Sequence, residues 1–346
     1  MTKLFTRLGA GALAIAAIAL GLVGPALAQD KIVLTVYSTL SFDVFQKYEA
    51  AFEAANPDID IQHVHDSGGV VTARLLAEKD NPQADVIWDL QATSVILMAD
   101  MGMLEPYEPV GFEALDPRLS DAGNPPAWIG YSAYAGLACY NHAEGATLGI
   151  PAPDSWADLT DPIYRGRITM PSPASSGTGF MIVAGFLDMM GEEEGWKYLD
   201  ALHENIAFYT HGGAKPCKLV SSGEQLVGLS YENAVVTLRE SGAPVDIIVP
   251  EEGVFWEIGA VAIVRGTAQL EAAQRLLDWT ASPEANAIYA EDWPIVALPG
   301  MAKQLPGLPE DFVERLHDAD FTWIADNREQ IIAEWERRYG TKMEPE

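Results

Sequence analysis

The alternation of strand and helix patterns over residues 31–100 restricts the fold of this chain more than any other feature. Runs of β-branched residues alternate there with apolar residues at helical spacing. The expected elements are, in chain order, strand 31–37, helix 42–56, strand 59–65, helix 70–79, strand 84–88 and helix 92–100. This order is typical of an open sheet with helices on both faces, so we expect an α/β fold.

The same kind of pattern begins again after about residue 130, behind the Pro-rich segment 124–126. An extended apolar run comes first, at 128–141. Further strands are expected at 167–170, 206–209, 227–231, 245–249 and 261–264, and further helices near 155–159 and at 178–190, 270–280, 283–289, 311–317 and 326–339. Because the pattern restarts, we predict two α/β lobes rather than one large sheet.

The first 28 residues have the pattern of a secretory signal peptide. Lys3 and Arg7 precede the apolar stretch 8–23, and Ala26-Leu27-Ala28 is a small-x-small cleavage site. We predict cleavage after Ala28 and a periplasmic location. The alternative is an uncleaved membrane anchor, for which the apolar stretch is short.

The charge balance excludes one class of function. The chain of 346 residues has 50 Asp and Glu against 21 Lys and Arg, so its formal net charge is −29. Removing residues 1–28, with two basic and no acidic residues, would change this charge to −31. A chain this acidic lacks the basic surface of a nucleic-acid-binding protein.

Cys139 and Cys217 are the only cysteines. An even count in an exported protein favours a disulfide, and the alternative is two buried free thiols. The sequence contains no CxxC or HExxH spacing for zinc and no GxSxG for a hydrolase. We therefore predict no metal site, no cofactor and no enzyme activity.

Ligands of open α/β sheets bind where strands end and helices begin, so the residues at these junctions are candidate binding residues. They are Ser38, Thr39, Ser67, Gly68, Trp88, Asp89, Ser175, Ser176, Gly177, Thr178, Tyr231, Glu232, Trp256 and Glu257.

The turn Ser-Ser-Gly-Thr-Gly at 175–179 is the sharpest signal among them. Small hydroxyl residues and glycine let an anion approach the backbone, and the following helix offers N–H groups and the positive end of its dipole. The alternative is an ordinary Ser/Thr helix cap. Asp89, Glu232 and Glu257 are candidates for holding a ligand amine, and the alternative is that they are solvated surface carboxylates.

Several segments together resemble a known family. AFEAANPDIDI, LLAEKDNPQADVIWDL, SWADLTDPIYRGRITMPSPASSGTGF and LLDWTASPEANAIYAEDWPIVALPG resemble the periplasmic solute-binding proteins of ABC importers, of the type II architecture. The narrower set DSGG, NPPAW, PASSGTGF, ALHENIAFYTH and KPCK resembles the 2-aminoethylphosphonate-binding members. Both cysteines match positions expected in that subgroup.

The resemblance implies two lobes that close on a small zwitterionic phosphonate and deliver it, as a monomer, to an ABC permease. Lobe one would be 29–131 plus 256–346, and lobe two 132–255, joined by crossover strands near 131–139 and 254–264. The phosphonate would sit on Ser38, Thr39, Ser67 and the turn 175–178. The ammonium would face Tyr231, Glu232, Trp256 and Glu257.

The sequence departs from that pattern at three places. Asp89 stands where the family pattern has Gly, Asn233 and Ala234 replace an aromatic residue and an Arg, and the loop 211–214 lacks Ser. Ferric iron and sugar phosphates are the same-fold alternatives, although iron sites need two adjacent Tyr where this chain has Tyr231-Glu232. A secreted hydrolase is the alternative from another class. We expect backbone N–H groups and hydroxyls, not Lys or Arg, to hold the anion.

Overall fold

The strands and helices of the first hundred residues follow the predicted order. A computed structural model describes residues 31–344, so the predicted signal peptide lies outside the described residues. The elements are β1 (Ile32–Ser38), α1 (Phe42–Ala55), β2 (Ile59–His65), α2 (Gly68–Ala77), β3 (Val86–Gln91) and α3 (Ala92–Asp100). β1 pairs in parallel with β2 on one side and β3 on the other. The third strand runs three residues further than predicted, which places Asp89 and Gln91 inside it.

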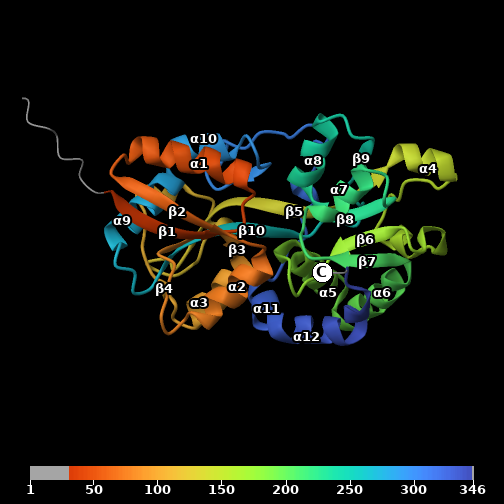
Figure 1. Cartoon of the computed structure of the whole chain (residues 1–346), viewed down its shortest axis with the longest axis horizontal. Helices are drawn as coiled ribbons and strands as arrows, with labels where there is room; N and C mark the ends of the chain where they lie inside the picture. The colour runs from red at the N-terminus through yellow and green to blue at the C-terminus, as the bar shows by residue number, and fades with distance from the viewer. Residues whose placement is uncertain (1–30, 345–346) are drawn as a thin grey trace, which may run out of the picture. The chain divides into compact units, whose positions relative to one another are not determined.

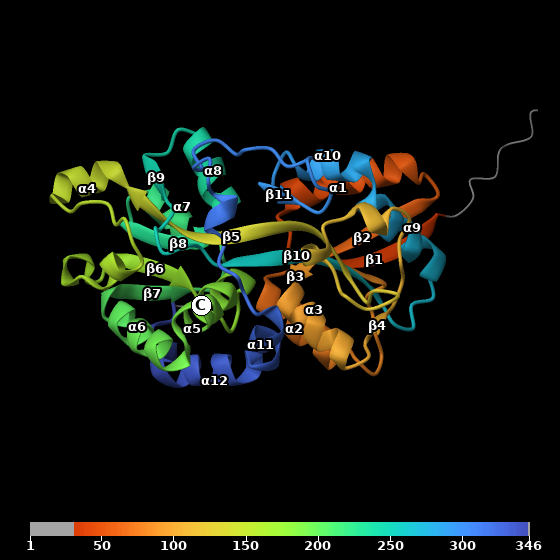
Figure 2. The same ribbon diagram turned by 180° about the vertical axis from the view of Figure 1, so that it is seen from behind.

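Two long antiparallel strands occupy the middle of the sheet (Figure 1, Figure 2). β5 (Ile129–Asn141) pairs with β10 (Trp256–Val264) through its first half and with β8 (Val227–Tyr231) through its second. The strand order is β2-β1-β3-β10-β5-β8-β6-β7. β5 therefore belongs to both halves of the sheet, at the position predicted for the first crossover strand.

The second half repeats the α/β pattern with more helices than the sequence predicted. Its elements are α4 (His142–Leu148), β6 (Ile168–Pro171), α5 (Gly177–Met190), α6 (Glu192–Asn205), β7 (Ile206–Thr210), α7 (Lys215–Ser221), α8 (Glu232–Glu240) and β9 (Val245–Ile248). No helix was predicted at α4, α6, α7 or α8. α6 nevertheless carries the signal, since its buried Trp196, Leu199 and Leu202 lie at helical spacing. The helices predicted near 155–159 and at 311–317 are short 3₁₀ turns.

Helices cover both faces of the first half of the sheet. α1 and α10 (Pro283–Tyr289) lie on one face, and α2 and α3 lie on the other (Figure 1). α9 (Leu270–Ala281) lies at the β1–β2 end. Two short strands complete the sheet: β4 (Leu104–Glu105) pairs with β10, and β11 (Ile295–Val296) pairs with β5.

The apolar side chains of the described residues form three clusters. The first surrounds Trp88 in the first half of the sheet, the second surrounds Phe186 on α5, and the third contains both cysteines. α11 (Phe321–Asp326) and α12 (Arg328–Tyr339) place Ile324 and Trp335 in the second cluster. The predicted lobe boundaries stay a prediction, and this packing favours counting α12 with lobe two, whereas α11 also packs against α3 of the first half.

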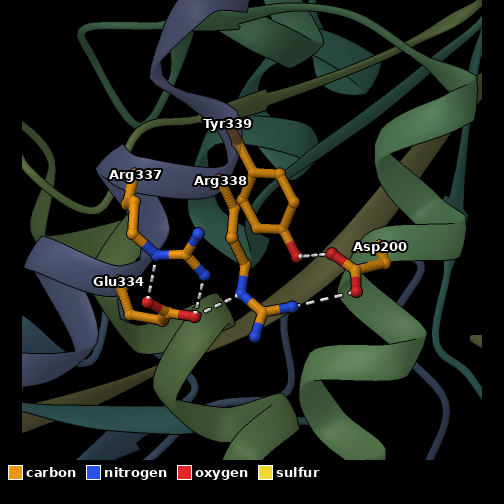
Figure 3. A network of polar contacts seen from close by, with 5 residues as sticks. All are labelled: Asp200, Glu334, Arg337, Arg338 and Tyr339. Atoms are coloured by element: carbon orange, nitrogen blue, oxygen red, sulfur yellow. Dashed lines mark hydrogen bonds and ion pairs between the residues drawn. The ribbon is translucent and has the colours of Figure 1, made fainter.

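Polar contacts hold α12 against α6 (Figure 3). Arg338 donates to Asp200 at 2.9 Å and to Glu334 at 2.6 Å, and the Tyr339 hydroxyl donates to Asp200 at 2.7 Å. Arg337 donates to Glu334 as well. Hydrogen bonds from the two arginines lower the pKa of Glu334 to about 2. The end of the chain is thus tied to the second half of the sheet.

A disulfide joins Cys139 on β5 to Cys217 on α7, which confirms the predicted pairing. The bond is buried, and it attaches a short helix to the strand that runs through both halves of the sheet. Within residues 31–344, no helix is both long enough and apolar enough to span a membrane.

Candidate functional site

A cavity of about 330 Å³ lies where the ends of strands from both halves of the sheet meet. The first half contributes residues that follow β1 and β2 and the last residues of β3, and the second half contributes the starts of α5 and α8 and the loop before α7. Tyr134, from β5, and Trp293 also line it. The position at strand ends is the one that the sheet pattern predicted.

Eight of the fourteen predicted binding residues line this cavity. They are Thr39, Ser67, Gly68, Asp89, Ser176, Gly177, Thr178 and Tyr231. They come from five separate segments of the chain, so only the fold brings them together. Their binding roles stay predictions, but their position is the one that those roles require.

Four predicted residues lie next to the cavity without lining it, because their side chains are engaged elsewhere. Ser38 is buried, and its hydroxyl oxygen accepts a hydrogen bond from the backbone N–H of Leu40 at 3.2 Å. Ser175 donates its hydroxyl to a backbone carbonyl at 3.1 Å. Trp88 is part of the first apolar cluster, and Trp256 donates its indole N–H to a carbonyl at 2.7 Å.

Glu232 and Glu257, the predicted amine partners, lie behind the cavity wall and are buried. Glu232 Oε2 accepts from the backbone N–H of Ala135 at 2.7 Å, and Glu257 Oε2 accepts from the Thr93 hydroxyl at 2.6 Å. Burial raises the pKa of Glu232 to about 8 and that of Glu257 to about 7. Neither carboxyl therefore presents a full negative charge to the cavity at neutral pH.

Asp89 is the acidic side chain that lines the cavity. Its carboxyl group is 7% exposed, accepts the Thr39 hydroxyl at 2.6 Å and accepts the Tyr131 hydroxyl at 2.8 Å. Burial raises its pKa, while these two hydrogen bonds and the nearby His65 oppose that shift. Each carboxylate oxygen can accept more than one bond, so Asp89 keeps capacity for a ligand cation.

Five helices of eight or more residues begin at this cavity. The N-cap residues of α1, α2, α3, α5 and α8 are Ser41, Ser67, Gln91, Ser176 and Tyr231. The side chain of Ser176 caps α5, whereas none of the other four N-cap side chains makes a capping hydrogen bond. Unsatisfied N–H groups and converging helix dipoles make this region favourable for an anion.

Several residues that line the cavity were not predicted from the sequence. They are Leu40, Ser41, Val44, His65, Gln91, Tyr134, Lys215, Lys218 and Trp293. Asn233 and the loop residues Gly212, Gly213 and Ala214, already noted as departures from the family pattern, line the cavity too. Two lysines therefore line the cavity, and the expectation that backbone N–H groups and hydroxyls, not Lys or Arg, hold the anion stays a prediction. Lys215 pairs with Glu344, whereas Lys218 has no ion pair among the described residues. The unpredicted helix α7 is the reason that both were overlooked.

Comparison with known proteins supplies the family. A family model described as bacterial extracellular solute-binding protein matches residues 81–325, which is more than half of the chain. The chain belongs to this family. It is the non-enzymatic solute-binding component of an ABC importer, whose partners are a small solute and a membrane permease.

Two relatives and one solved structure show how far this likeness extends. A probable ABC transporter periplasmic-binding protein of Sinorhizobium fredii is 30% identical over 306 residues, covering 86% of this chain and 80% of that protein. A candidate 2-aminoethylphosphonate-binding periplasmic protein of Salmonella typhimurium is 27% identical over 260 residues, covering 70% of this chain and 72% of that protein.

The solved structure is that of the periplasmic binding protein AfuA from Actinobacillus pleuropneumoniae with fructose 6-phosphate bound. Its TM-score is 0.83 at 27% identity, and the match covers 90% of this chain and 99% of that one. The predicted α/β periplasmic-binding-protein fold is thereby confirmed.

Proposed function

We propose that this solute-binding protein captures 2-aminoethylphosphonate or a closely related small zwitterionic phosphonate. The Salmonella relative named for that ligand supports the choice of ligand, and AfuA supports a ligand that carries a phosphoryl-type anion. We further propose that the protein works as a monomer in the periplasm after cleavage at Ala28.

The observation that carries the proposal is that one cavity is lined both by the starts of several helices, which favour an anion, and by the carboxyl group of Asp89, which favours a cation. The starts of α2 and α5, with the Thr178 hydroxyl, form the anion-binding end. Asp89 forms the cation-binding end, and Tyr231 adds an aromatic wall. A cavity of about 330 Å³ is at the small end of ligand pockets, which suits a small zwitterion.

A sugar phosphate is the second candidate, because AfuA was solved with fructose 6-phosphate. Lys218, which lines the cavity, could add a charge to a phosphate dianion. The two candidates differ at Asp89, since a sugar phosphate has no cation for this carboxylate.

Thermal shift of residues 29–346 against a ligand panel distinguishes these proposals. The panel contains 2-aminoethylphosphonate, methylphosphonate, fructose 6-phosphate and ferric citrate. A ligand at 100 times its dissociation constant stabilises the folded state by about 2.7 kcal/mol. We expect the largest shift with 2-aminoethylphosphonate. The proposal is wrong if that ligand gives no shift while fructose 6-phosphate or ferric citrate does.

A further inference from the structure

Gln91, which the sequence analysis did not single out, ends β3 at the point where two helices from different halves of the sheet begin. Its side chain is 2% exposed and lines the cavity. Its amide Nε2 is buried without a hydrogen-bond partner among the described residues. A buried donor with no acceptor is unfavourable, so such a group in a binding cavity points to a missing acceptor.

The glycines around Gln91 show how closely the two helix starts approach it. A Cβ atom on Gly68, the first residue of α2, would lie 2.6 Å from the amide oxygen of Gln91. A Cβ atom on Gly177, the first residue of α5, would lie 2.7 Å from the same oxygen. A side chain at either position would force the Gln91 amide to move. The two glycines therefore leave room for the Gln91 side chain between the helices.

The starts of α2 and α5 are also close to each other. The Cβ position of Gly68 is 3.1 Å from the backbone nitrogen of Gly177, and that of Gly69 is 2.5 Å from the carbonyl oxygen of Ala174. An anion on the cavity side of these helix starts would face their positive ends, and Gln91 Nε2 lies 3.1 Å from the Cβ position of Gly177. The amide is neutral, so it adds a directed hydrogen bond without a second charge.

We propose that the side-chain amide of Gln91 is a specificity-determining donor that binds the anionic group of the ligand between the starts of α2 and α5. This inference rests on the proposed function, since it deepens the description of the same cavity. The orphaned amide and the two glycines that accommodate it carry the inference.

Calorimetric titration of Gln91→Met and Gln91→Glu tests it. Met has nearly the shape of Gln but no donor, so binding of both 2-aminoethylphosphonate and methylphosphonate should weaken at least tenfold. Gln91→Glu should weaken binding of both ligands further at pH 8, because its carboxylate occupies the place of the ligand's anion. Lowering the pH to 5.5 should restore part of this loss relative to wild type, because a protonated Glu regains a donor.

Gln225→Met is the matched control, because Gln225 is a partly buried glutamine outside the cavity with an unpartnered amide oxygen. It should bind both ligands as wild type does. Affinity within twofold of wild type in Gln91→Met would overturn the inference. If Gln91→Met does not fold, a pH-independent affinity of Gln91→Glu relative to wild type would overturn it.

Failure of the proposed function gives a different result. If wild type binds fructose 6-phosphate and neither phosphonate, the ligand class is wrong, and the same Gln91 variants are then titrated with fructose 6-phosphate. A tenfold loss with that ligand would still support the amide as the anion donor, and an unchanged affinity would refute it. If wild type binds neither phosphonate, nor fructose 6-phosphate, nor inorganic phosphate, both proposals fail.

Discussion

At the scale of single residues, Asp89 combines an unusual backbone conformation with a polar environment. Its φ is 70°, and among the described residues it is the one non-glycine residue with a positive φ. Asp and Asn tolerate this left-handed region better than most residues, and Gly adopts it without cost. A Gly, which the resemblance leads us to expect here, would adopt this conformation without strain. A carboxylate in its place gains contacts with Thr39 and Tyr131 and faces the cavity.

We predict that Asp89→Asn weakens binding of 2-aminoethylphosphonate at least tenfold and affects methylphosphonate less. Asn keeps the backbone conformation and removes the charge that would pair with the ligand's ammonium. Because burial raises the pKa of Asp89, wild-type affinity for the amine-bearing ligand should also fall as the pH falls through that pKa. Titration of both proteins from pH 8 to pH 4.5 measures these effects. Equal losses for the two ligands would remove Asp89 from the cation-binding end.

Thr178, the second residue of α5, lines the cavity and is 8% exposed. Its hydroxyl and the nearby N–H groups make the helix start a site for an anion. We predict that Thr178→Ala weakens phosphonate binding about tenfold without unfolding the protein. Thr178→Ser, which keeps the hydroxyl, should lose much less of its affinity for the phosphonate. Equal affinities for the two variants would show that the hydroxyl does not bind ligand.

At the scale of elements, the disulfide links β5 to α7, and α7 begins with the cavity residue Lys215. The two cysteines are 78 residues apart in the chain. A cross-link over a loop of this length stabilises the folded state by roughly 4 kcal/mol in the chain-entropy model. The same bond holds the loop before α7 next to the cavity.

We predict that the double variant Cys139→Ser, Cys217→Ser unfolds at a lower urea concentration than wild type. Its free energy of unfolding should be lower by about 2–4 kcal/mol. Reduction of wild type should have a similar effect. The loss of ligand-binding free energy should be smaller than the loss of unfolding free energy, because the positions of the cavity residues on α2 and α5 do not depend on the disulfide. Urea unfolding with and without dithiothreitol, followed by circular dichroism, measures the change. Identical midpoints would show that the bond does not contribute to stability.

At the scale of the whole molecule, two buried carboxyl groups make the free energy of unfolding depend on pH. Burial raises the pKa of Glu232 from 4.5 to about 8 and that of Glu257 from 4.5 to about 7. The folded state therefore holds these protons more tightly than the unfolded state. Their contribution is complete below pH 4.5 and is lost as the pH rises through the folded pKa values, by at most about 1.4 kcal/mol per pH unit for each group.

We predict that the free energy of unfolding of wild type decreases between pH 5 and pH 8. Glu232→Gln, which cannot ionise, should show a smaller decrease over the same range. Chemical denaturation of both proteins at pH 5, 6, 7 and 8 measures the two slopes. Parallel slopes would contradict a raised pKa for Glu232.

The strand and helix order of residues 31–100 could be read from the sequence because local patterns encode it, whereas α4, α6, α7 and α8 were not predicted. β-branched runs and helical spacing predicted β1 to α3, and the Ser-Ser-Gly-Thr-Gly turn predicted the start of α5 within one residue. Thr39, Asp89 and Thr178, which were expected at a ligand site because they lie at strand ends or a helix start, line one cavity, and their binding roles stay predictions.

The tertiary structure alone decided which of these residues face the cavity. Burial and hydrogen bonding turn Glu232 and Glu257 away from it, and no local pattern records such long-range contacts. The sequence did not single out Gln91, because its importance depends on Gly68 and Gly177, which belong to two helices far apart in the chain. The sequence determined the elements of residues 31–100 and the strand ends that meet at the cavity, since both follow from short-range periodicity. Which side chains reach the ligand depended on packing between segments far apart in the chain.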